Sequence, residues 1–452
     1  MADLRRLLDE GKPIFGTDGV RGLAGSELTP ELALAIGRAA GSRLRTGPVV
    51  IGRDTRRSGA MLSSAMAAGF NASGIDTSDV GILPSGGVSY LTGSTSASMG
   101  VMVSASHNPA PDNGIKLLSS RGGKLPDEDE RAIEAMLRDL GSVRSATAGA
   151  IGTEFPHHDA LHEYVGFLAG LSKYSLNGMR LALDCAHGAA FRAAPELFNL
   201  LKADVEVHGD APDGTNINAG VGATNPEFLA GIAEGRIGLA FDGDADRLMV
   251  IDEDGRVANG DVVMAIVARH MAAQGQLRKN LLVATVMSNL GLRKSMSEAG
   301  IEMVETQVGD RYVMEELQAR RGLLGGEQSG HIIFLDHGQT GDGLLTALRL
   351  LEVVAGTGKE IRQLRAEAIT EYPQVLVNVE VARGRDLASA DEVWDEVTEV
   401  VNTLGADGRV LVRPSGTEPL VRVMVEASTE SDAQRYADRL ASVIAEAMGK
   451  EV

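Results

Sequence analysis

Five short apolar segments of this chain each end in a polar or glycine-rich loop, and this recurrence constrains the fold more than any other feature. The segments are VVIGRDTRRS (49–58), VMVSASHN (101–108), LALDCAHG (181–188), LAFDGDADR (239–247) and LLVATVMSNLG (281–291). Each apolar run has the length of a buried strand, and we expect a helical stretch after each loop. Strands that alternate with helices in this way predict α/β domains.

Local signals place some of the helices and the domain boundaries. Thr29 followed by Pro30 is typical of a helix start, because the hydroxyl caps and proline suits the first turn. Helical spacing of apolar residues predicts another helix over 127–140. The small-residue stretch 141–152, a hairpin over 250–261 and the segment 370–373 are candidate boundaries. Beyond the last one, alternating strands and an amphipathic helix over 432–448 predict a small α+β domain.

Charge and composition exclude several classes of protein. The chain has 452 residues and a net charge of 43 − 62 = −19, which disfavours binding to nucleic acid or to an anionic membrane. The length alone predicts roughly three domains. Cys185 is the single cysteine, so no internal disulfide can form, and neither a signal-like start nor a membrane-spanning apolar run is present. We therefore expect a cytoplasmic protein that binds anions only through a local cluster of donors.

Three aspartates follow the apolar run GLAF at alternate positions: Asp242, Asp244 and Asp246. Carboxylates this close repel one another unless a cation lies between them, and hard oxygen ligands suit Mg²⁺ or Ca²⁺. An EF-hand is excluded because its sixth position, normally glycine, is Arg247, and because the flanks are strand-like. The alternative is a solvated acidic turn. Three protein ligands would leave room for a phosphate oxygen, so we interpret the cluster as a catalytic metal site.

The serines of SASHNPAPDNGIK (104–116) are candidate nucleophiles. The chain has no G-x-S-x-G motif, and in an extended chain His107 would point away from Ser106, which argues against a serine hydrolase. The alternative is that these residues only form turns and caps. Lys116 supplies a positive charge ten residues on, and the aspartates supply a metal. A serine beside a metal and a lysine favours phosphoryl transfer.

Three further loops carry candidate binding residues. RPSGTEP (413–419) offers a donor set for a phosphate, although a plain hairpin turn is the alternative. GGEQSGH (325–331) suits sugar hydroxyls or an amine, and FGTDGVRG (15–22) adds a cation among glycines. We interpret Arg53, Lys124 and Arg311 as solvated or structural residues. The candidates are Arg413, Ser415, Gly416, Thr417 and Arg422 for the phosphate, Glu327 and Ser329 for the sugar, and Arg21 for a second phosphate contact.

Taken together, these segments resemble the α-D-phosphohexomutase superfamily, and within it the bacterial phosphoglucosamine mutases. FGTDGVRG, SASHNPAPDNGIK, DGDADR, GEQSGH and RPSGTEPLVRVMVE follow in the order of the superfamily, and Gln328 favours the glucosamine branch over relatives that read GEMSGH. The resemblance implies three similar α/β domains with mixed sheets and a smaller C-terminal α+β domain around a central cleft. We accordingly assign domains to 1–150, 151–256, 257–371 and 372–452.

The resemblance also implies a reaction and its residues. Ser106 as a phosphoserine would convert glucosamine 6-phosphate to glucosamine 1-phosphate through a 1,6-bisphosphate, which must turn around between two transfers. Mg²⁺ would be held by Ser106, Asp242, Asp244 and Asp246. Catalysis would involve Ser106, Lys116, Arg21, His107 and Arg247, and substrate would be bound by Glu327, Ser329, His331, Arg413, Ser415, Gly416, Thr417 and Arg422. Sugar phosphates are the implied partners, glucosamine or glucose 1,6-bisphosphate the implied activator, and a homodimer a possible assembly.

Three alternatives stay open. The chain would be a phosphomannomutase/phosphoglucomutase if the glucosamine preference were absent. It would be a Mg²⁺-dependent sugar phosphatase if phosphoryl groups passed to water, although a hydrolase needs no second phosphate region. A non-catalytic sugar-phosphate binder is disfavoured because Ser106 and all three aspartates are present. Two departures from the family pattern are Ala245, where many members have glycine, and Gly86-Gly87, which we place in a linker that leaves the chemistry untouched.

Overall fold

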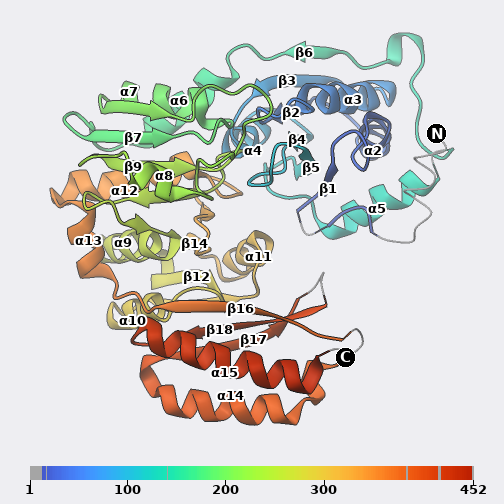
Figure 1. Cartoon of the computed structure of the whole chain (residues 1–452). Helices are drawn as coiled ribbons and strands as arrows, with labels where there is room; N and C mark the ends of the chain where they lie inside the picture. Colours follow the sequence, from blue (N-terminus) through green and yellow to red (C-terminus); the bar gives the residue numbers. More distant parts are fainter. Residues whose placement is uncertain (1–12, 17, 140, 383–384, 416–418, 450–452) are drawn as a thin grey trace. The chain divides into compact units, whose positions relative to one another are not determined.

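The computed structural model describes residues 13–16, 18–139, 141–382, 385–415 and 419–449 (Figure 1). By internal contacts the chain divides into two compact units, and a short internal segment belongs to the second. Unit 1 comprises 1–287 and 300–368, and unit 2 comprises 288–299 and 369–452. Within the described ranges, no helix combines the length and the apolar character that crossing a membrane requires.

The first sheet of unit 1 has six strands in the order β1-β5-β4-β2-β3-β6. Strands β4, β2, β3 and β6 run parallel, whereas β5 is antiparallel to both β4 and β1, so the sheet is mixed. The strands are β1 (Val20–Leu23), β2 (Val49–Arg53), β3 (Thr77–Ile82), β4 (Met99–Val103), β5 (Asp112–Ser119) and β6 (Glu154–Pro156).

Helices cover both faces of this sheet. One core cluster joins apolar residues of α2 (Pro30–Arg43), α3 (Gly59–Ala72) and α5 (Asp127–Arg138) to alternate residues of β2, β4 and β5. The predicted cap of α2 is confirmed, because Thr29 Oγ1 accepts a hydrogen bond from Leu32 N at 3.3 Å. Helix α4 (Ser85–Ser94) packs on β2 and β4, where Val88 lies against Gly52.

The second sheet has the order β11-β10-β9-β7-β8 and is also mixed. Its strands are β7 (Arg180–Asp184), β8 (Asp204–His208), β9 (Ile237–Phe241), β10 (Leu248–Ile251) and β11 (Val257–Ala258), and its helices are α6 (Ala160–Leu171), α7 (Ala190–Leu200) and α8 (Pro226–Ala230). The predicted hairpin forms between β10 and β11, so it extends past the domain boundary that we placed after residue 256.

The third sheet of unit 1 has the order β13-β12-β14-β15, with β15 antiparallel to β14. Its strands are β12 (Leu281–Thr285), β13 (Glu302–Thr306), β14 (Leu324–Gly326) and β15 (Ile332–Phe334), and the helices are α9 (Gly260–Ala273), α11 (Asp310–Arg320), α12 (Gly343–Thr357) and α13 (Ile361–Ala368). Val313 and Leu317 of α11 form a core with β12 and β15. This packing fixes α11 beside the β14–β15 turn.

Unit 2 contains the three-stranded antiparallel sheet that was predicted at the end of the chain, in the order β16-β18-β17. Its elements are α10 (Leu290–Glu298), β16 (Gln374–Glu380), α14 (Asp391–Leu404), β17 (Arg409–Pro414), β18 (Leu420–Glu426) and α15 (Glu430–Met448). The buried Glu426 carboxylate ties α10 to this sheet, because it accepts from Leu290 N at 3.2 Å and from Arg409 Nε at 3.0 Å.

The mixed α/β fold agrees with the prediction, but the helix expected after each loop forms in only three of the five segments. β2, β7 and β12 lead into α3, α7 and α10, whereas β4 and β9 lead into the antiparallel strands β5 and β10. Both exceptions have a non-glycine residue in the left-handed region, Ser106 with φ 51° and Ala245 with φ 57°, although the loop after β7 has two such residues, Ala186 and His187, and still leads into α7. These tight loops send the chain back along its own sheet instead of over it.

Gly86 and Gly87 lie in the first turn of α4 and not in a linker, so that interpretation was wrong. The preceding residue, Ser85, donates its Oγ to Asp244 Oδ2 at 2.7 Å and its backbone N–H to Asp244 O at 2.9 Å. A Cβ at Gly86 would overlap with the carboxylate of Asp342, which caps α12. This turn therefore supports the acidic loop directly.

Gly86→Ala is expected to lower the free energy of unfolding by about 1–3 kcal/mol, because the added methyl group overpacks against Asp342. Gly166→Ala in α6 is the matched control, because a Cβ there meets no atom within 4 Å. That substitution is expected to stabilise by about 0.5–1 kcal/mol through helix propensity. Denaturant melts of both variants test the pair, and equal stability of the two would contradict this packing.

Candidate active site

The loop after β4 holds Ser106 in a strained conformation. Its φ of 51° lies in the left-handed region, which a serine adopts only when its surroundings impose it. Ser106 N donates to Ser104 Oγ at 2.8 Å, and Ser104 Oγ in turn donates to Asp54 Oδ2 at 2.7 Å. Asn218 Nδ2 donates to Ser106 O at 2.9 Å from a loop of the second sheet. Ser104 is thus a support for Ser106 and not a second nucleophile.

A buried arginine holds the rest of this loop. Arg56 donates to Ser106 O at 2.9 Å, to Asn108 O at 2.8 Å and to Asp112 O at 2.9 Å, and it also contacts Pro109 O. Its Nε pairs with Asp54 Oδ2 at 2.8 Å, and both side chains are fully buried. One guanidinium therefore satisfies carbonyls along the whole serine loop, which fixes the path of the backbone.

Ser106 Oγ points at the carboxylate cluster and donates to Asp242 Oδ2 at 2.7 Å. His107 Nδ1 lies 3.3 Å from Ser106 Oγ. Our argument that an extended chain separates the two side chains was wrong, because the left-handed backbone of Ser106 turns them together. Burial, and then the nearby Arg247 and Arg21, lower the pKa of His107 to about 4, so its imidazole is neutral at pH 7.

The three aspartates form a compact and buried set. One ligand atom from each of Asp242, Asp244 and Asp246 lies within 4.8 Å of the others. Burial and the two neighbouring carboxylates raise the pKa of Asp242 well above its usual range. Asp244 Oδ1 and Asp246 Oδ1 are buried without a hydrogen-bond donor among the described residues. Buried carboxylate oxygens that lack donors fit a divalent cation with oxygen ligands.

Lys116 leaves β5 on the same side as this cluster. Its Nζ lies 3.1 Å from Asp18 Oδ2, 3.3 Å from Asp244 Oδ2 and 3.6 Å from Asp246 Oδ2. Burial opposes its charge, but the three carboxylates outweigh burial and raise the pKa of Lys116 well above its usual range. The ammonium is therefore protonated in this arrangement and can donate a proton or neutralise a phosphate.

Arg21 and Arg247 flank the serine from two different domains of unit 1. Arg21 pairs with Asp18 and donates to Asn108 Oδ1 at 3.3 Å, which places it on the serine loop. Arg247 N donates to Asp242 Oδ1 at 3.1 Å, and its Nε lies 4.0 Å from Asp246 Oδ1. Two guanidiniums beside Ser106 suit an oxyanion such as a phosphoryl group.

The β14–β15 turn brings the predicted sugar residues to the same place. A backbone bridge joins Arg247 to His331, whose Nδ1 lies 3.5 Å from Asp246 Oδ2 and whose Nε2 accepts from Gly341 N at 3.1 Å. Glu327 Oε1 accepts from Gly309 N at 3.0 Å. A cavity of about 500 Å³ joins these groups, and its walls include Arg21, Ser106, Asp246, Arg247, Asp310, Glu327 and His331. Ser329 is not among the residues that line it.

The predicted phosphate residues lie in unit 2. Arg413 on β17 and Arg422 on β18 are direct cross-strand partners. Burial, and then Arg422, lower the pKa of Arg413, as expected for two cations held side by side. Ser415 follows at the end of the β17 segment, whereas Gly416 and Thr417 lie outside the described residues. Two guanidiniums on adjacent strands suit an anionic ligand.

Several site residues were missed by the sequence interpretation: Asp18, Asp54, Arg56, Ser85 and Asn218. Asp18 had a usable signal, since it shares the FGTDGVRG loop with Arg21. Ser85 and Asn218 gave none, because their partners are distant in sequence, whereas Asp54 and Arg56 pair with each other two positions apart in the VVIGRDTRRS segment. Of the residues taken as solvated or structural, Arg53 pairs with Asp79 at 3.0 Å and Arg311 with Asp127 and Glu315.

Comparisons with known proteins agree with this geometry. Four family models match the chain: the phosphoglucomutase/phosphomannomutase α/β/α domains I, II and III over residues 12–143, 162–255 and 259–372, and the C-terminal domain over 376–443. A phosphoglucosamine mutase of Halalkalibacterium halodurans is 47% identical over 97% of this chain and 99% of that protein. One of Desulforudis audaxviator is 47% identical over 96% of this chain and 98% of that protein.

Solved structures give the same result. A phosphoglucomutase/phosphomannomutase family protein of Burkholderia thailandensis superposes with a TM-score of 0.80 at 26% identity, covering 96% of this chain and 97% of that one. The fold and the order of the four matched domains are thus shared across nearly the whole length. The chain belongs to the phosphohexomutase family, among the phosphoglucosamine mutases.

Proposed function

We propose that this protein is a phosphoglucosamine mutase, an isomerase-class phosphotransferase that interconverts glucosamine 6-phosphate and glucosamine 1-phosphate. The observation that carries the proposal is the placement of Ser106 Oγ 2.7 Å from Asp242, inside a buried carboxylate cluster and beside His107. A serine oxygen beside a buried carboxylate cluster of this kind can carry a phosphoryl group. The identity of the relatives at 46–47% supports the same reaction.

The proposed cycle has two phosphoryl transfers. In the first, a sugar hydroxyl attacks the phosphorus on Ser106, the bond from Ser106 Oγ to phosphorus breaks, and a sugar 1,6-bisphosphate results. In the second, Ser106 Oγ attacks the other phosphate, and the sugar monophosphate leaves. In each transfer the attacking hydroxyl loses one proton and the leaving oxygen gains one, so the protons balance. Lys116, whose ammonium lies beside three carboxylates, would give its proton to the leaving oxygen and regain one from the attacking hydroxyl.

Charge on the moving phosphoryl group needs neutralisation in both transfers. Asp242, Asp244 and Asp246, with an oxygen of the phosphoserine, would hold Mg²⁺, which supplies Lewis-acid stabilisation of the transferring phosphoryl group when bound. Arg21 and Arg247 would contact the remaining phosphoryl oxygens. Arg413, Ser415, Gly416, Thr417 and Arg422 stay the proposed donors for the phosphate that does not react. Glucosamine or glucose 1,6-bisphosphate is the proposed activator, and the expected cytoplasmic location and homodimer remain predictions.

Two carboxylates favour an amino sugar as the substrate. Asp310 and Glu327 line the active-site cavity, and neither pairs with a cation within 4.0 Å among the described residues. An ammonium group on the sugar would supply that cation, whereas glucose and mannose offer only a hydroxyl. Glu327 and His331 would also contact the sugar hydroxyls, and Ser329 would need a shift of the β14–β15 turn to do so.

The substrate preference tests the proposal. The value of kcat/KM for glucosamine 6-phosphate is expected to exceed those for glucose and mannose 6-phosphates by at least about 10²-fold, since a site built for a polar group rejects ligands that lack it. Asp310→Asn is expected to reduce this ratio at least about tenfold, with less effect on the glucose reaction. Equal values for the three sugars would indicate a phosphomannomutase/phosphoglucomutase. Inorganic phosphate as the main product would indicate a phosphatase.

A further inference from the structure

The side chain of Ser85 reaches the carboxylate cluster from a different domain of unit 1. Ser85 lies in the matched domain I and Asp244 in the matched domain II. Ser85 is the first residue of α4, and its Oγ donates to Asp244 Oδ2 at 2.7 Å while its backbone N–H donates to Asp244 O at 2.9 Å. Both side chains are buried, so bulk water does not compete for this bond. One residue of α4 therefore holds both the backbone and one carboxylate oxygen of Asp244.

The helix that carries Ser85 is fixed by its packing. Val88, three residues further along α4, is fully buried against Gly52 of β2. The space beside Gly86 is filled by the carboxylate of Asp342. A hydroxyl–carboxylate bond of 2.7 Å is of the short, charge-assisted kind. Because the donor sits on a packed helix, it holds the Asp244 carboxylate in one orientation.

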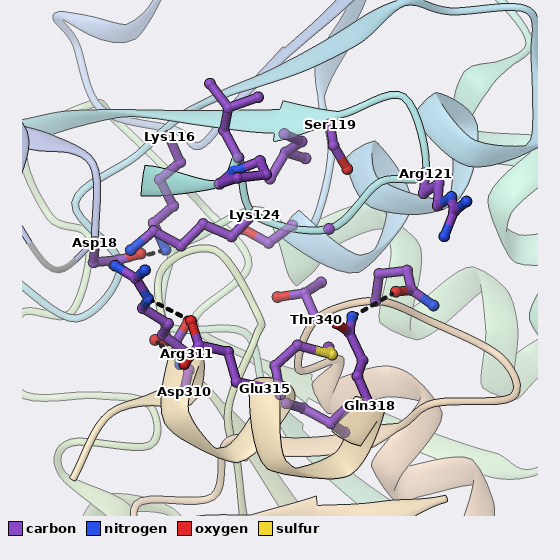
Figure 2. Close-up of a pocket in the computed structure, with 18 of the residues that line it drawn as sticks. Asp18, Lys116, Ser119, Arg121, Lys124, Asp310, Arg311, Glu315, Gln318 and Thr340 are labelled. Atoms are coloured by element: carbon purple, nitrogen blue, oxygen red, sulfur yellow. Dashed lines mark hydrogen bonds and ion pairs between the residues drawn. The ribbon is translucent and has the colours of Figure 1, made fainter. Parts of the chain in front are cut away.

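The two carboxylate oxygens of Asp244 have different surroundings. Oδ2 accepts from Ser85, and Lys116 Nζ lies 3.3 Å from the same oxygen. Figure 2 shows Lys116 extending toward Asp18, with which it pairs at 3.1 Å, so its ammonium is shared among several carboxylates. Asp244 Oδ1 is buried and has no hydrogen-bond donor among the described residues. Ser85 is thus the shorter of two contacts that keep Oδ2 from a metal, whereas Oδ1 is open to one.

Asp246 repeats this arrangement. Its Oδ2 lies 3.5 Å from His331 Nδ1 and 3.6 Å from Lys116 Nζ, whereas its Oδ1 is buried without a donor in the part of the chain that the structure describes. Asp244 and Asp246 therefore each offer one oxygen to a cation. Coordination through single oxygens suits Mg²⁺, which demands a near-octahedral set and usually keeps several waters. Ca²⁺ takes about six to eight oxygens and commonly binds both oxygens of a carboxylate.

We propose that Ser85 makes the metal site selective for Mg²⁺ over Ca²⁺, because it prevents Asp244 from binding a cation through both oxygens. The inference rests on the proposed metal site at the three aspartates. Ser85 is a positioning residue, since it acts on the metal through Asp244. Without its hydroxyl, Oδ2 would be free for a second bond to the cation, and that bond favours the larger Ca²⁺. Selectivity of this kind comes from disfavouring the competitor.

The ratio of the dissociation constants for Ca²⁺ and Mg²⁺ tests this role. Isothermal titration calorimetry measures both constants on the full-length protein, with the phosphorylation of Ser106 matched between samples by intact mass. The wild type is expected to bind Mg²⁺ at least about tenfold more tightly than Ca²⁺, and Ser85→Ala is expected to lower this ratio at least about fivefold. A loop that was merely loosened would weaken the binding of both cations alike and leave the ratio unchanged.

Two further variants are the matched controls. Ser89→Ala removes another buried hydroxyl from α4, one that donates to Gly122 O at 2.8 Å and not to an aspartate. Its ratio is expected to equal that of the wild type. Ser85→Thr retains the hydroxyl, so it is expected to keep the selectivity that Ser85→Ala loses. Thermal melts verify that each variant is folded.

Each outcome decides the proposal. A lower ratio in Ser85→Ala, with Ser89→Ala and Ser85→Thr like the wild type, supports it. An unchanged ratio in Ser85→Ala overturns it, even if both cations bind more weakly. An equal fall in Ser89→Ala also overturns it, because the effect would then come from the packing of α4. A wild type that binds Ca²⁺ as tightly as Mg²⁺ overturns it and leaves the mutase function standing. A wild type that binds neither cation contradicts the metal site of the proposed function itself.

Discussion

Ser106→Ala is expected to lower kcat for isomerisation at least about 10⁴-fold, because the phosphoryl carrier is removed and no other hydroxyl can take its place. Ser104 is the nearest candidate, but its Oγ is fully occupied: it accepts from Ser106 N at 2.8 Å and donates to Asp54 Oδ2 at 2.7 Å. The variant is also expected to incorporate no ³²P from labelled sugar bisphosphate. Quantitative intact-mass analysis and the label measure this directly.

Ser104→Ala is the matched control for that experiment. It removes a hydroxyl of the same size two residues away, and it leaves Ser106 Oγ on Asp242. We expect a loss of about fivefold in kcat, since one hydrogen bond of about 1 kcal/mol that positions Ser106 is lost. Phosphorylation of the protein should persist. If Ser104→Ala abolished labelling while Ser106→Ala retained it, the two serines would have to exchange roles.

The metal site should survive the loss of Ser106. The three aspartates keep their places in Ser106→Ala, so titration calorimetry is expected to detect Mg²⁺ binding with an affinity within about tenfold of the wild type. Loss of both metal binding and activity in this variant would instead indicate a collapsed loop. This measurement separates the chemical role of Ser106 from its structural one.

Elements that depend on local pattern could be predicted from the sequence. The apolar runs at 49–53, 181–184, 237–241 and 281–285 form buried strands because each is short and bounded by a polar loop. The aspartate cluster was also predictable, since alternate positions in one tight turn place the three carboxylates together whatever the rest of the fold does.

The direction of the chain after the strands could not be predicted in the same way. The loops at Ser106 and Ala245 turn back into antiparallel strands through a residue with positive φ, a conformation that neither serine nor alanine favours by itself. The conformation of Ser106 is imposed by Arg56 and Asn218, which lie in other loops, and by Ser104, two residues earlier in the same loop. The same backbone brings His107 next to Ser106 Oγ, against the prediction from an extended chain.

Partners far apart in sequence account for the other omissions. Ser85 donates to Asp244, which lies 159 positions later in the sequence. Its neighbour Gly86 was interpreted as part of a linker, because Asp342, against which it packs, is also distant in the sequence. Asp18 faces Lys116 only because β1 and β5 pair in the sheet. The residues that do the chemistry lie in recognisable motifs, whereas those that position them are defined by the fold.

Arg56 is the strongest of these positioning residues, and Arg56→Ala is expected to lower the free energy of unfolding by about 3–5 kcal/mol. The truncation leaves Asp54 as a buried carboxylate without its cation, and it removes one donor from each of four carbonyl oxygens of the serine loop. Burial raises the pKa of Asp54 even with Arg56 present, which shows how poorly the site tolerates an unpaired charge. Denaturant unfolding measures the loss, and Arg57→Ala, at the exposed neighbouring position, should change stability by less than about 0.5 kcal/mol.

Arg56→Lys separates positioning from simple charge balance. An ammonium can still pair with Asp54, so part of the stability should return, but it cannot reproduce the planar fork that contacts Ser106 O, Asn108 O and Asp112 O. We expect kcat of the folded lysine variant to fall about 10²-fold with KM nearly unchanged, because a nucleophile displaced by even 1 Å loses its attack geometry while the sugar and phosphate contacts remain. A lysine variant with wild-type kcat would show that the left-handed Ser106 is maintained without the guanidinium. Catalysis would then depend on Asn218 and Ser104 alone for the alignment of Ser106 Oγ with Asp242.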